Sequence, residues 1–244
     1  MSNESNPARR DDILKLFAGL RLTDVCDAMD AVGLQDIYLM DPRIGPLWRD
    51  TERFRHRICG LAHTVRFIPA RRRAPVFERV EEHMEWKGQW YRELARGPIG
   101  EEIRDGDVIV IDASGVRDCG YVGSHNALGW IAAGARGAVT NGGARDTDEL
   151  IKEGVPVYSA GVSRGIRPGR LELESTGRPI TVGGVYVRPG DVIVADGDGV
   201  IVVPIERAAQ VAEVATQIQE SDKAGRRKLY EKLGLPGDFT VEPR

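Results

Sequence analysis

The chain opens with two short stretches in which apolar residues recur every three or four positions. Residues 11–20 carry theirs at Ile13, Leu14, Leu16 and Phe17, and a second stretch of this kind starts at Thr23. Such spacing puts the apolar side chains on one face of a helix, so two short helices are predicted. Residues 205–233 show the same pattern with many charged positions and predict a long amphipathic helix, followed from Pro236 by a loosely held tail.

The middle of the chain contains uninterrupted apolar runs instead. Residues 59–68 predict a strand that ends at Pro69, and residues 108–112 and 137–140 predict strands buried on both faces of a sheet. Between the last two, the Ala-rich residues 127–137 predict a helix closed by glycine. Strand, helix and strand form a βαβ unit, whose right-handed crossover puts its loops where open α/β sheets bind ligands.

The remainder combines one further helix with short strands. A helix begins at Asp146 with acidic residues in its first turn, which the helix dipole favours, and residues 155–159 predict a short strand. Residues 78–96 are rich in Trp, Glu and Arg and look helical, although they could form a local insertion. Gly-rich turns separate the last predicted strands, at residues 180–187, 189–196 and 199–204. With 244 residues, the chain is predicted to form one α/β domain with short appendages.

Composition and charge narrow the function. Hydrophobic residues make up 41% of the chain and charged residues 29%, as in ordinary globular proteins. A formal net charge of -3 provides no general attraction for nucleic acid, and the basic run Arg71 to Arg73 is interpreted as a solvated face rather than an RNA or partner contact. No apolar run approaches the ~18 residues that cross a bilayer, and the first residues lack a signal peptide's apolar stretch, so we expect a cytoplasmic protein.

Cysteine and histidine positions indicate no metal cluster. The cysteines show no CxxC spacing, which argues against a disulfide framework or a zinc knuckle. They are interpreted as core or near-core thiols, at Cys26, Cys59 and Cys119. His63 lies on an apolar strand and is expected to be a core histidine, whereas His56 and His83 have no grouping typical of metal ligands.

Candidate chemistry concentrates in two segments that flank the βαβ unit. Residues 120–130 place glycines and exposed amides near a helix N-terminus, a geometry suited to a carboxylate. Residues 141–146 place Arg145, which can bind a carboxylate through two parallel hydrogen bonds, beside Asp146, an oxygen ligand suited to Mg²⁺. The alternative is ordinary turn chemistry with a surface ion pair. The residues alone indicate a candidate anion and metal site and do not name a reaction.

The same segments resemble the RraA-like family. Asn-Gly-Gly-Ala-Arg-Asp-Thr-Asp-Glu at residues 141–149 is similar to the family's signature, in which a strand leads through glycine and small residues into Arg-Asp and an acidic helix start. Gly123 lies 22 residues before Arg145, the interval expected in this family. Similar family patterns occur at residues 23–29, 60–65 and 191–204, so that the resemblance covers roughly residues 20–204.

The resemblance implies a fold and an assembly. The expected fold is α/β, of the RraA-like β/β/α swivelling-domain type, with N-terminal helices and a C-terminal helix. The expected organisation is a helical extension over residues 1–19, a catalytic domain over residues 20–205, and a C-terminal helix and tail over residues 206–244 that pack on a neighbouring subunit. The resemblance also implies a homotrimer or hexamer with active sites at subunit boundaries.

The resemblance further implies an activity. The family's aldolases cleave 4-hydroxy-4-methyl-2-oxoglutarate or 4-carboxy-4-hydroxy-2-oxoadipate to pyruvate and a second oxo acid, often with oxaloacetate decarboxylase activity. By position, a small 2-oxo acid would be held by Gly123, Ser124, His125, Asn126 and Arg145. Asp146 would hold Mg²⁺ or Mn²⁺, so that the charge of the pyruvate enolate would meet the metal and Arg145 together. Arg145, Asp146 and His125 are the expected catalytic residues.

Ser124 departs from the family pattern, in which aldolases tend to carry an acidic residue. Serine is a poor base unless it is activated, so either His125 or a water on the metal takes the proton, or the reaction differs. His125 can equally be interpreted as a loop imidazole that caps the following helix. Glu220 is a weak candidate for an acid contributed by a neighbouring subunit, and a solvated position is the simpler interpretation.

Three functions therefore stay open. The first is an aldolase or decarboxylase, and the second is another lyase on the same scaffold, such as a sugar-acid dehydratase. The third is a non-catalytic regulator that binds an endoribonuclease or RNA helicase. Asp146 argues against the third, because the family's regulator of ribonuclease activity lacks an aspartate after its arginine.

Overall fold

The computed structural model describes residues 7–98, 100–116 and 118–243. Its strands are β1 (Gly45–Pro46), β2 (Ile58–Pro69), β3 (Asp107–Asp112), β4 (Gly120–Val122), β5 (Gly137–Ala144), β6 (Val157–Val162), β7 (Leu171–Thr176), β8 (Ile180–Val182), β9 (Val185–Val187), β10 (Val192–Asp196) and β11 (Gly199–Val203). Its α-helices are α1 (Pro7–Phe17), α2 (Leu22–Ala31), α3 (Val80–Glu93), α4 (Ser124–Ala132), α5 (Thr147–Glu153) and α6 (Ala208–Leu233).

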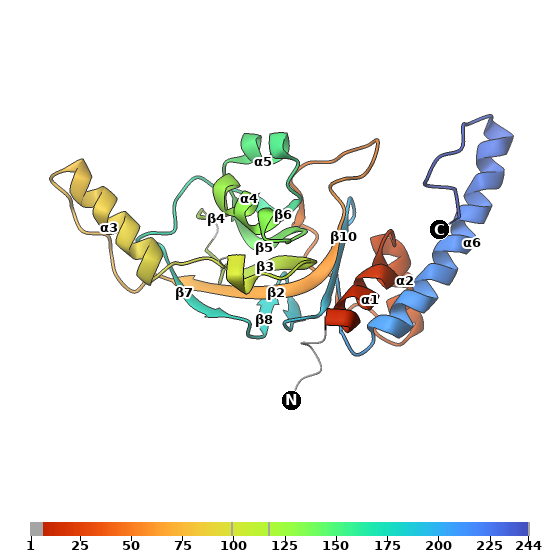
Figure 1. Ribbon diagram of the computed structural model, residues 1–244, viewed down its shortest axis with the longest axis horizontal. Helices are drawn as coiled ribbons and strands as arrows, with labels where there is room; N and C mark the ends of the chain where they lie inside the picture. Colours follow the sequence, from red (N-terminus) through yellow and green to blue (C-terminus); the bar gives the residue numbers. More distant parts are fainter. Residues whose placement is uncertain (1–6, 99, 117, 244) are drawn as a thin grey trace.

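A nine-stranded mixed sheet organises the fold. Its order is β1-β6-β5-β3-β2-β10-β11, with β4 paired to β5 and β7 to β2, and β8 and β9 form a separate hairpin. Strands β2, β3, β5 and β6 run parallel, while β10 is antiparallel to β2. Figure 1 shows α4 and α5 over one face of this sheet, with α1, α2 and α6 beside β10 and α3 projecting at the opposite end. The predicted α/β class is confirmed.

Strand β3 is an uninterrupted apolar run because it packs against a core on each face of the sheet. Ile109 and Ile111 belong to the core that packs under α4 and α5, whereas Val108 and Val110 belong to the core shared with the β8–β9 hairpin. Every residue of β3 is buried. The βαβ unit of β3, α4 and β5 is therefore present as predicted, and its parallel strands end at one edge of the sheet.

Two boundaries in this unit differ from the prediction. The helix over residues 127–137 is instead α4, which begins at Ser124 and ends at Ala132, because Gly123 adopts the extended backbone of an N-cap. Strand β5 continues to Ala144 instead of ending at residue 140. Both shifts move the residues next to the candidate site from loops into regular elements.

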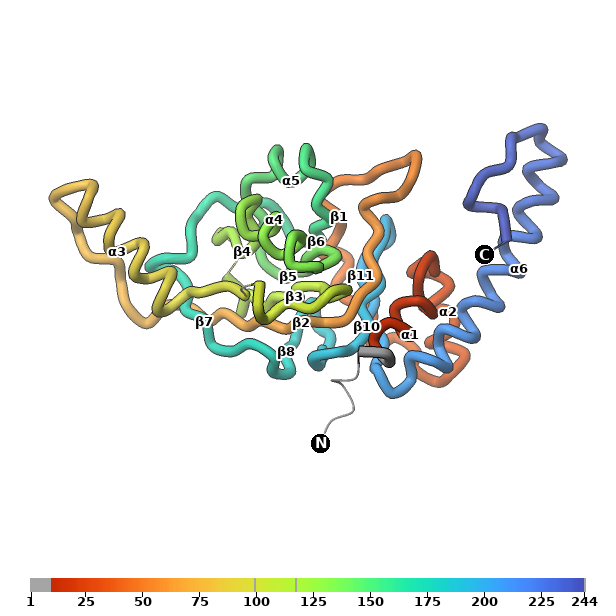
Figure 2. The backbone as a smooth tube through the Cα atoms, in the orientation of Figure 1, coloured from red at the N-terminus to blue at the C-terminus, as the bar shows by residue number. Residues whose placement is uncertain are grey.

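The helical end of the molecule has its own core. Phe17 of α1, Val25 of α2 and Val211 of α6 are fully buried against β10 and β11. Helix α6 extends beyond this core, and Figure 2 shows the chain turning back alongside it. The expectation of a loosely held tail is wrong: Val241 is 1% exposed, and Arg227 donates to its carbonyl at 2.6 Å.

The uncertain segment over residues 78–96 forms α3. Its indole rings pack together, with the Trp86 and Trp90 centroids 5.3 Å apart, and Trp90 Nε1–H donates to the Leu171 carbonyl at 2.9 Å. This bond ties α3 to the start of β7, a strand that the sequence analysis did not predict. Across the described ranges, no helix combines the length and apolar character needed to span a bilayer.

The structure confirms the prediction for the cysteines but not the one for His63. Cys119 is buried and Cys26 and Cys59 are half-buried, which confirms the interpretation as core or near-core thiols. His63 is only half-buried, because it stands at the edge of the core, with Nδ1 3.6 Å from Asp107 Oδ2. His56 is the buried histidine, and its Nδ1 accepts a hydrogen bond from the Asp50 amide at 3.0 Å.

Candidate functional site

A hollow of about 540 Å³ opens where β4 and β5 end and α4 begins. Five of the predicted site residues line it together: Gly123, His125, Asn126, Arg145 and Asp146. The sixth, Ser124, contributes its backbone, because its amide donates to Asp146 Oδ2 at 3.3 Å. The volume of the hollow lies within the range typical of small-ligand sites, about 300–1,000 Å³.

Two glycines let Arg145 and Asp146 lie against β4 and the start of α4. A methyl group on Gly120 would overlap the Arg145 side chain, and one on Gly123 would come within 2.9 Å of Asp146 Oδ2. The backbone of the first segment therefore approaches the side chains of the second more closely than any other residue type allows. This is the physical reason for glycine at both positions.

Arg145 and Asp146 form an ion pair within the hollow. Arg145 Nε lies 3.1 Å from Asp146 Oδ1, and the two side chains are 32% and 34% exposed. Asp146 adopts a left-handed backbone, φ 54° and ψ 44°, at the N-cap of α5, yet its carboxylate makes no capping hydrogen bond. Left-handed aspartate is uncommon and costs free energy, so the carboxylate is aimed into the hollow at the expense of ordinary capping.

His125 does not cap the helix that follows it. Gly123 is the N-cap of α4, and Ser124, His125 and Asn126 form its first turn, so the interpretation of His125 as a loop imidazole that caps this helix is wrong. First-turn amides of a helix lack partners within the helix and carry the positive end of its dipole. Since these amides adjoin Arg145, this end of α4 suits a carboxylate.

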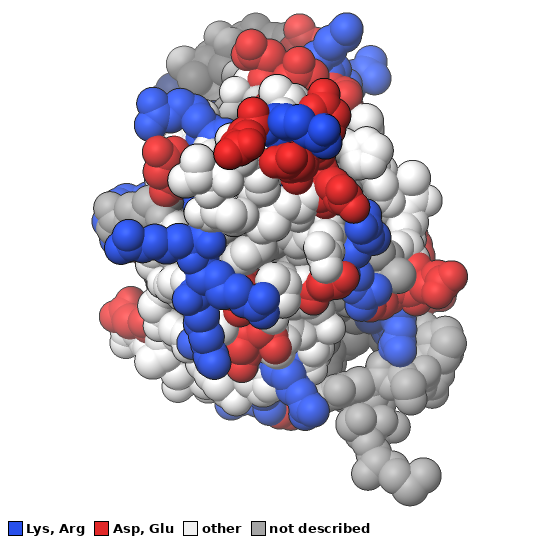
Figure 3. All heavy atoms as spheres, turned by 90° about the vertical axis from the view of Figure 1, so that its left-hand side faces the viewer, with Lys and Arg blue, Asp and Glu red and all other residues white. Residues whose placement is uncertain are grey.

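The hollow carries far more positive than negative charge. Among the described residues that line it, Lys87, Arg96, Arg145 and Arg167 stand against the single carboxylate of Asp146. Arg96 forms an ion pair at 2.7 Å with Glu102, which is not among the described lining residues. Figure 3 views the molecule from the end where α3 projects and shows Lys and Arg side chains gathered on this face with acidic ones between them. An anionic ligand fits this charge distribution.

The donor set suits a loosely ligated hard cation. Across the described residues, no three His, Cys, Asp or Glu side chains lie close enough to enclose a metal ion. Mg²⁺ nevertheless keeps several waters and uses one or two protein carboxylates together with substrate oxygens. Asp146, one-third exposed in the hollow, fits that role, whereas a site built for Zn²⁺ needs three or four protein ligands.

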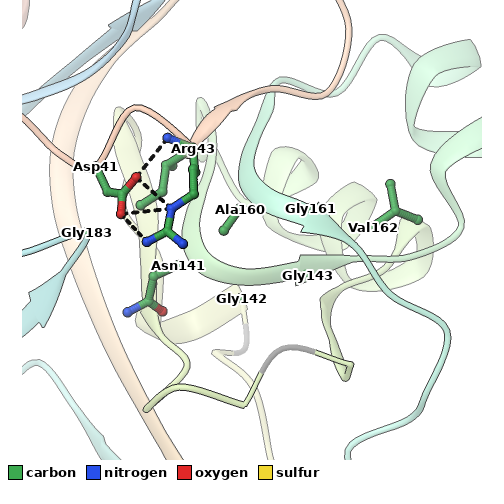
Figure 4. Close-up of a pocket in the computed structure, with 10 residues that line it drawn as sticks. Asp41, Arg43, Asn141, Gly142, Gly143, Ala160, Gly161, Val162 and Gly183 are labelled. Atoms are coloured by element: carbon green, nitrogen blue, oxygen red, sulfur yellow. Dashed lines mark hydrogen bonds and ion pairs between the residues drawn. The ribbon is translucent and has the colours of Figure 1, made fainter.

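A second cavity of about 290 Å³ lies near β5, β6 and the residues before β1, as Figure 4 shows. Its charged side chains neutralise each other, because Arg43 Nε donates to Asp41 Oδ1 at 3.0 Å. Asn141 has a structural task here, since its Oδ1 accepts from the Ala113 amide at 2.7 Å and its Nδ2 donates to Asp112. The hollow around Arg145 is therefore the stronger candidate site.

Part of the lining was not predicted from the sequence. Lys87 and Tyr91 come from α3, and Arg167 comes from the connection between β6 and β7. No motif marks these residues, and only tertiary contacts of α3 and of the β6–β7 connection bring them to the hollow. Glu220 is not among the described residues that line it, and Lys223 lies 4.0 Å from Glu220 on α6.

The fold and the site together define an α/β protein with a cationic hollow and one carboxylate at the end of a parallel strand. The sequence model of the RraA-like family, described as Aldolase/RraA, matches residues 22–202. The chain therefore belongs to the RraA-like family, as the sequence resemblance predicted.

Individual relatives support this assignment. Protein DlpA of Legionella pneumophila is 24% identical over 235 residues, which cover 91% of this chain and 34% of DlpA. A protein of Halalkalibacterium halodurans, named as a candidate 4-hydroxy-4-methyl-2-oxoglutarate aldolase, is 34% identical over 134 residues, which cover 54% of this chain and 62% of that protein. The chain thus spans about a third of the first relative and less than two thirds of the second.

A solved structure shows the same fold. RraAS2 of Streptomyces coelicolor, described as an unusual member of the RNase ES inhibitor RraA protein family, superimposes with a TM-score of 0.68. The two chains are 24% identical, and the alignment covers 88% of this chain and 96% of the other. The predicted RraA-like fold class is confirmed.

Proposed function

We propose that the protein is a divalent-metal-dependent lyase that cleaves or decarboxylates a small 2-oxo acid through a pyruvate enolate. The observation that carries this proposal is the convergence of Arg145, Asp146 and the first turn of α4 on one hollow. The aldolase name of the Halalkalibacterium halodurans relative supports the same reaction class. The physiological form is proposed to be a homotrimer or hexamer.

The residues divide the binding task. Arg145 binds the substrate carboxylate, and the amide N–H groups at the start of α4 donate to the remaining negative charge. Asp146 would hold Mg²⁺ or Mn²⁺, which supplies Lewis-acid stabilisation for charge on the 2-oxo group. Because Arg145 is a fixed cation, its interaction strengthens as the enolate acquires charge, which is the condition for lowering the barrier.

His125 is the proposed proton acceptor in aldol cleavage. Removal of the hydroxyl proton turns the carbinol into a carbonyl while the carbon–carbon bond breaks, and its electron pair forms the enolate. A proton then returns to the enolate carbon to give pyruvate. His125 lines the hollow, and an imidazole exchanges protons near neutral pH, whereas the Ser124 hydroxyl does not.

Pyruvate release tests this proposal. We expect release from 4-hydroxy-4-methyl-2-oxoglutarate or oxaloacetate with Mg²⁺ or Mn²⁺, and loss with chelator. Arg145→Met and Asp146→Asn each lower kcat/KM by about 100-fold or more, the scale of losing one charge-stabilising group. Asp148→Asn, an exposed acid two positions along α5, is the matched control and retains activity. Binding of Mn²⁺, followed by electron paramagnetic resonance, should weaken only in the Asp146→Asn protein.

Two outcomes would redirect the assignment. Turnover that is unaffected by chelator and by Asp146→Asn would refute the metal role. Water loss from a sugar acid without carbon–carbon cleavage would select a dehydratase on the same scaffold.

A further inference from the structure

Arg167 is a buried cation in the wall of the hollow. Only 5% of the residue is exposed, and its guanidinium carbon lies over two aromatic rings, 5.2 Å from the centroid of Phe67 and 5.2 Å from that of Tyr91. It lines the same hollow as Arg145 and Asp146. Contacts with both rings restrict the guanidinium, which still borders the hollow.

No carboxylate of the described residues pairs with Arg167. Its side-chain interactions within that part of the chain are the two ring contacts and a hydrogen bond with Tyr91. Burial accordingly lowers the pKa of Arg167, because desolvation outweighs the attraction of Tyr91 and Cys119. A buried guanidinium without an anion is unfavourable, so its position in a ligand-sized hollow indicates a ligand that supplies the anion.

The protein holds Arg167 in register with Arg145. The Ser163 amide donates to the Ala144 carbonyl at 2.8 Å, and the Gly120 amide donates to the Gly165 carbonyl at 2.9 Å. The connection that carries Arg167 is therefore tied to the strands that position Arg145. A methyl group on Gly97 would come within 3.3 Å of Arg167 Nη1, so glycine there leaves room beside the guanidinium.

We propose that Arg167 binds a second carboxylate of the substrate, at the end remote from the carboxylate bound by Arg145. This assignment rests on the proposed lyase function for the reaction. What it adds is the residue that recognises the second carboxylate of such an oxo acid. A planar guanidinium matches a carboxylate through two parallel hydrogen bonds. Lys87 and Arg96 add positive field in the same hollow.

The position of this cation also bears on which bond breaks. A carboxylate that leaves as carbon dioxide loses its charge in the transition state, so a cation paired with it stabilises the reactant more than the transition state. The carboxylate held by Arg167 is therefore retained. Aldol cleavage satisfies this condition, because the bond between C3 and C4 breaks and the departing carbonyl product keeps the second carboxylate.

A matched pair of substrates tests the proposal. 4-Hydroxy-4-methyl-2-oxoglutarate and 4-hydroxy-4-methyl-2-oxopentanoate differ by a carboxylate in place of a methyl group, and both can release pyruvate. We expect the wild-type protein to favour the dicarboxylate by about 100-fold or more in kcat/KM, as for other sites built to bind a polar group. Arg167→Met should reduce this preference to within about fivefold and leave the monocarboxylate rate within about threefold.

The control variant is Arg164→Met, on the same connection. Arg164 is exposed and paired with Asp118 at 3.1 Å, and it does not belong to the described lining of the hollow. This variant should keep the wild-type preference. Equal loss with both substrates in the Arg167→Met protein would overturn the proposal, because it would show a general effect on the site instead of recognition of a second charge.

Calorimetry separates this proposal from the lyase assignment. 2-Oxoglutarate and 2-oxopentanoate are the probes, with Mg²⁺ present. Wild type should bind 2-oxoglutarate about 30-fold or more tightly than 2-oxopentanoate, and Arg167→Met should lack this preference. If neither hydroxy acid is turned over, the lyase assignment fails and the binding preference still decides the role of Arg167. Equal affinity of wild type for the two probes would overturn the second-carboxylate site whatever the turnover.

Discussion

Arg167→Met should make the ligand-free protein more stable. The change removes a buried guanidinium that has no described carboxylate partner, while methionine keeps an apolar stem between Phe67 and Tyr91. Desolvation of a buried ion costs several kcal/mol, and the two cation–π contacts return about 1–3 kcal/mol together. The net expectation is a gain of about 1–2 kcal/mol in the free energy of unfolding.

Thermal unfolding without ligand measures this gain. For a chain of this size about 1 kcal/mol corresponds to about 2–4 °C, so Tm should rise by about 2–8 °C at a fixed protein concentration. Addition of 2-oxoglutarate should reverse the order. At about 100 times its Kd, the ligand stabilises the wild-type protein by about 2.7 kcal/mol, and the variant loses most of this effect.

A fall in Tm in the ligand-free Arg167→Met protein would refute this reasoning. It would mean that the aromatic contacts outweigh desolvation and that Arg167 serves the fold. Arg164→Met is again the control, because an exposed ion pair contributes about 0–1 kcal/mol and its loss should leave Tm nearly unchanged. If 2-oxoglutarate raised the Tm of Arg167→Met as much as that of Arg164→Met, the assigned contact between Arg167 and the second carboxylate would be contradicted.

Two further predictions concern Gly123, which lies against Asp146, and the buried Asp107. Gly123→Ala puts a methyl group 2.9 Å from Asp146 Oδ2, so pyruvate release should fall by at least about tenfold while circular dichroism reports an intact fold. Asp107→Asn should cost about 1–3 kcal/mol at pH 7, because Asp107 is buried and pairs with Arg10 at 2.8 Å. Although burial raises the pKa of Asp107, hydrogen bonds from His63, the Arg104 amide and Arg10 lower it overall. The carboxylate therefore contributes stability above about pH 4 that is lost as pH falls through its folded pKa, and unfolding titrations of Asp107→Asn should lack this step.

The parts of the fold that follow from local pattern were predictable. β3 had to be buried on both faces because its apolar run has no polar side, and the structure places cores on both faces. β4 was not predicted, because three residues carry too little periodicity and gain their strand conformation from pairing with β5. β7 was missed even though its alternation of leucine and glutamate is typical of a half-buried strand.

The candidate site likewise contains residues that could be predicted from the sequence and one that could not. Gly123, Arg145 and Asp146 were predicted because two short motifs flank one βαβ unit, and parallel strands bring their carboxyl ends to the same edge. Arg167 could not be predicted from the residues around it. Its proposed role depends on the Phe67 ring of β2, the Tyr91 ring of α3 and the lack of a carboxylate partner among the described residues, none of which is a local property.

Different parts of the chain build the two halves of the hollow. One half carries the groups proposed for the reaction, and the other carries the groups proposed to select the substrate. β4, β5 and α4 carry the groups proposed for enolate formation, and they are fixed by the buried centre of the sheet. α3 and the connection before β7 carry Tyr91 and Arg167, and α3 is held to the domain by contacts such as the Trp90 bond to Leu171. On the proposed assignment, substitution of the Arg167 side chain changes which acid fits, whereas Arg145 and Asp146 keep their places after β5. The projecting helix α3 is therefore part of the proposed site, and its contribution is to select the ligand.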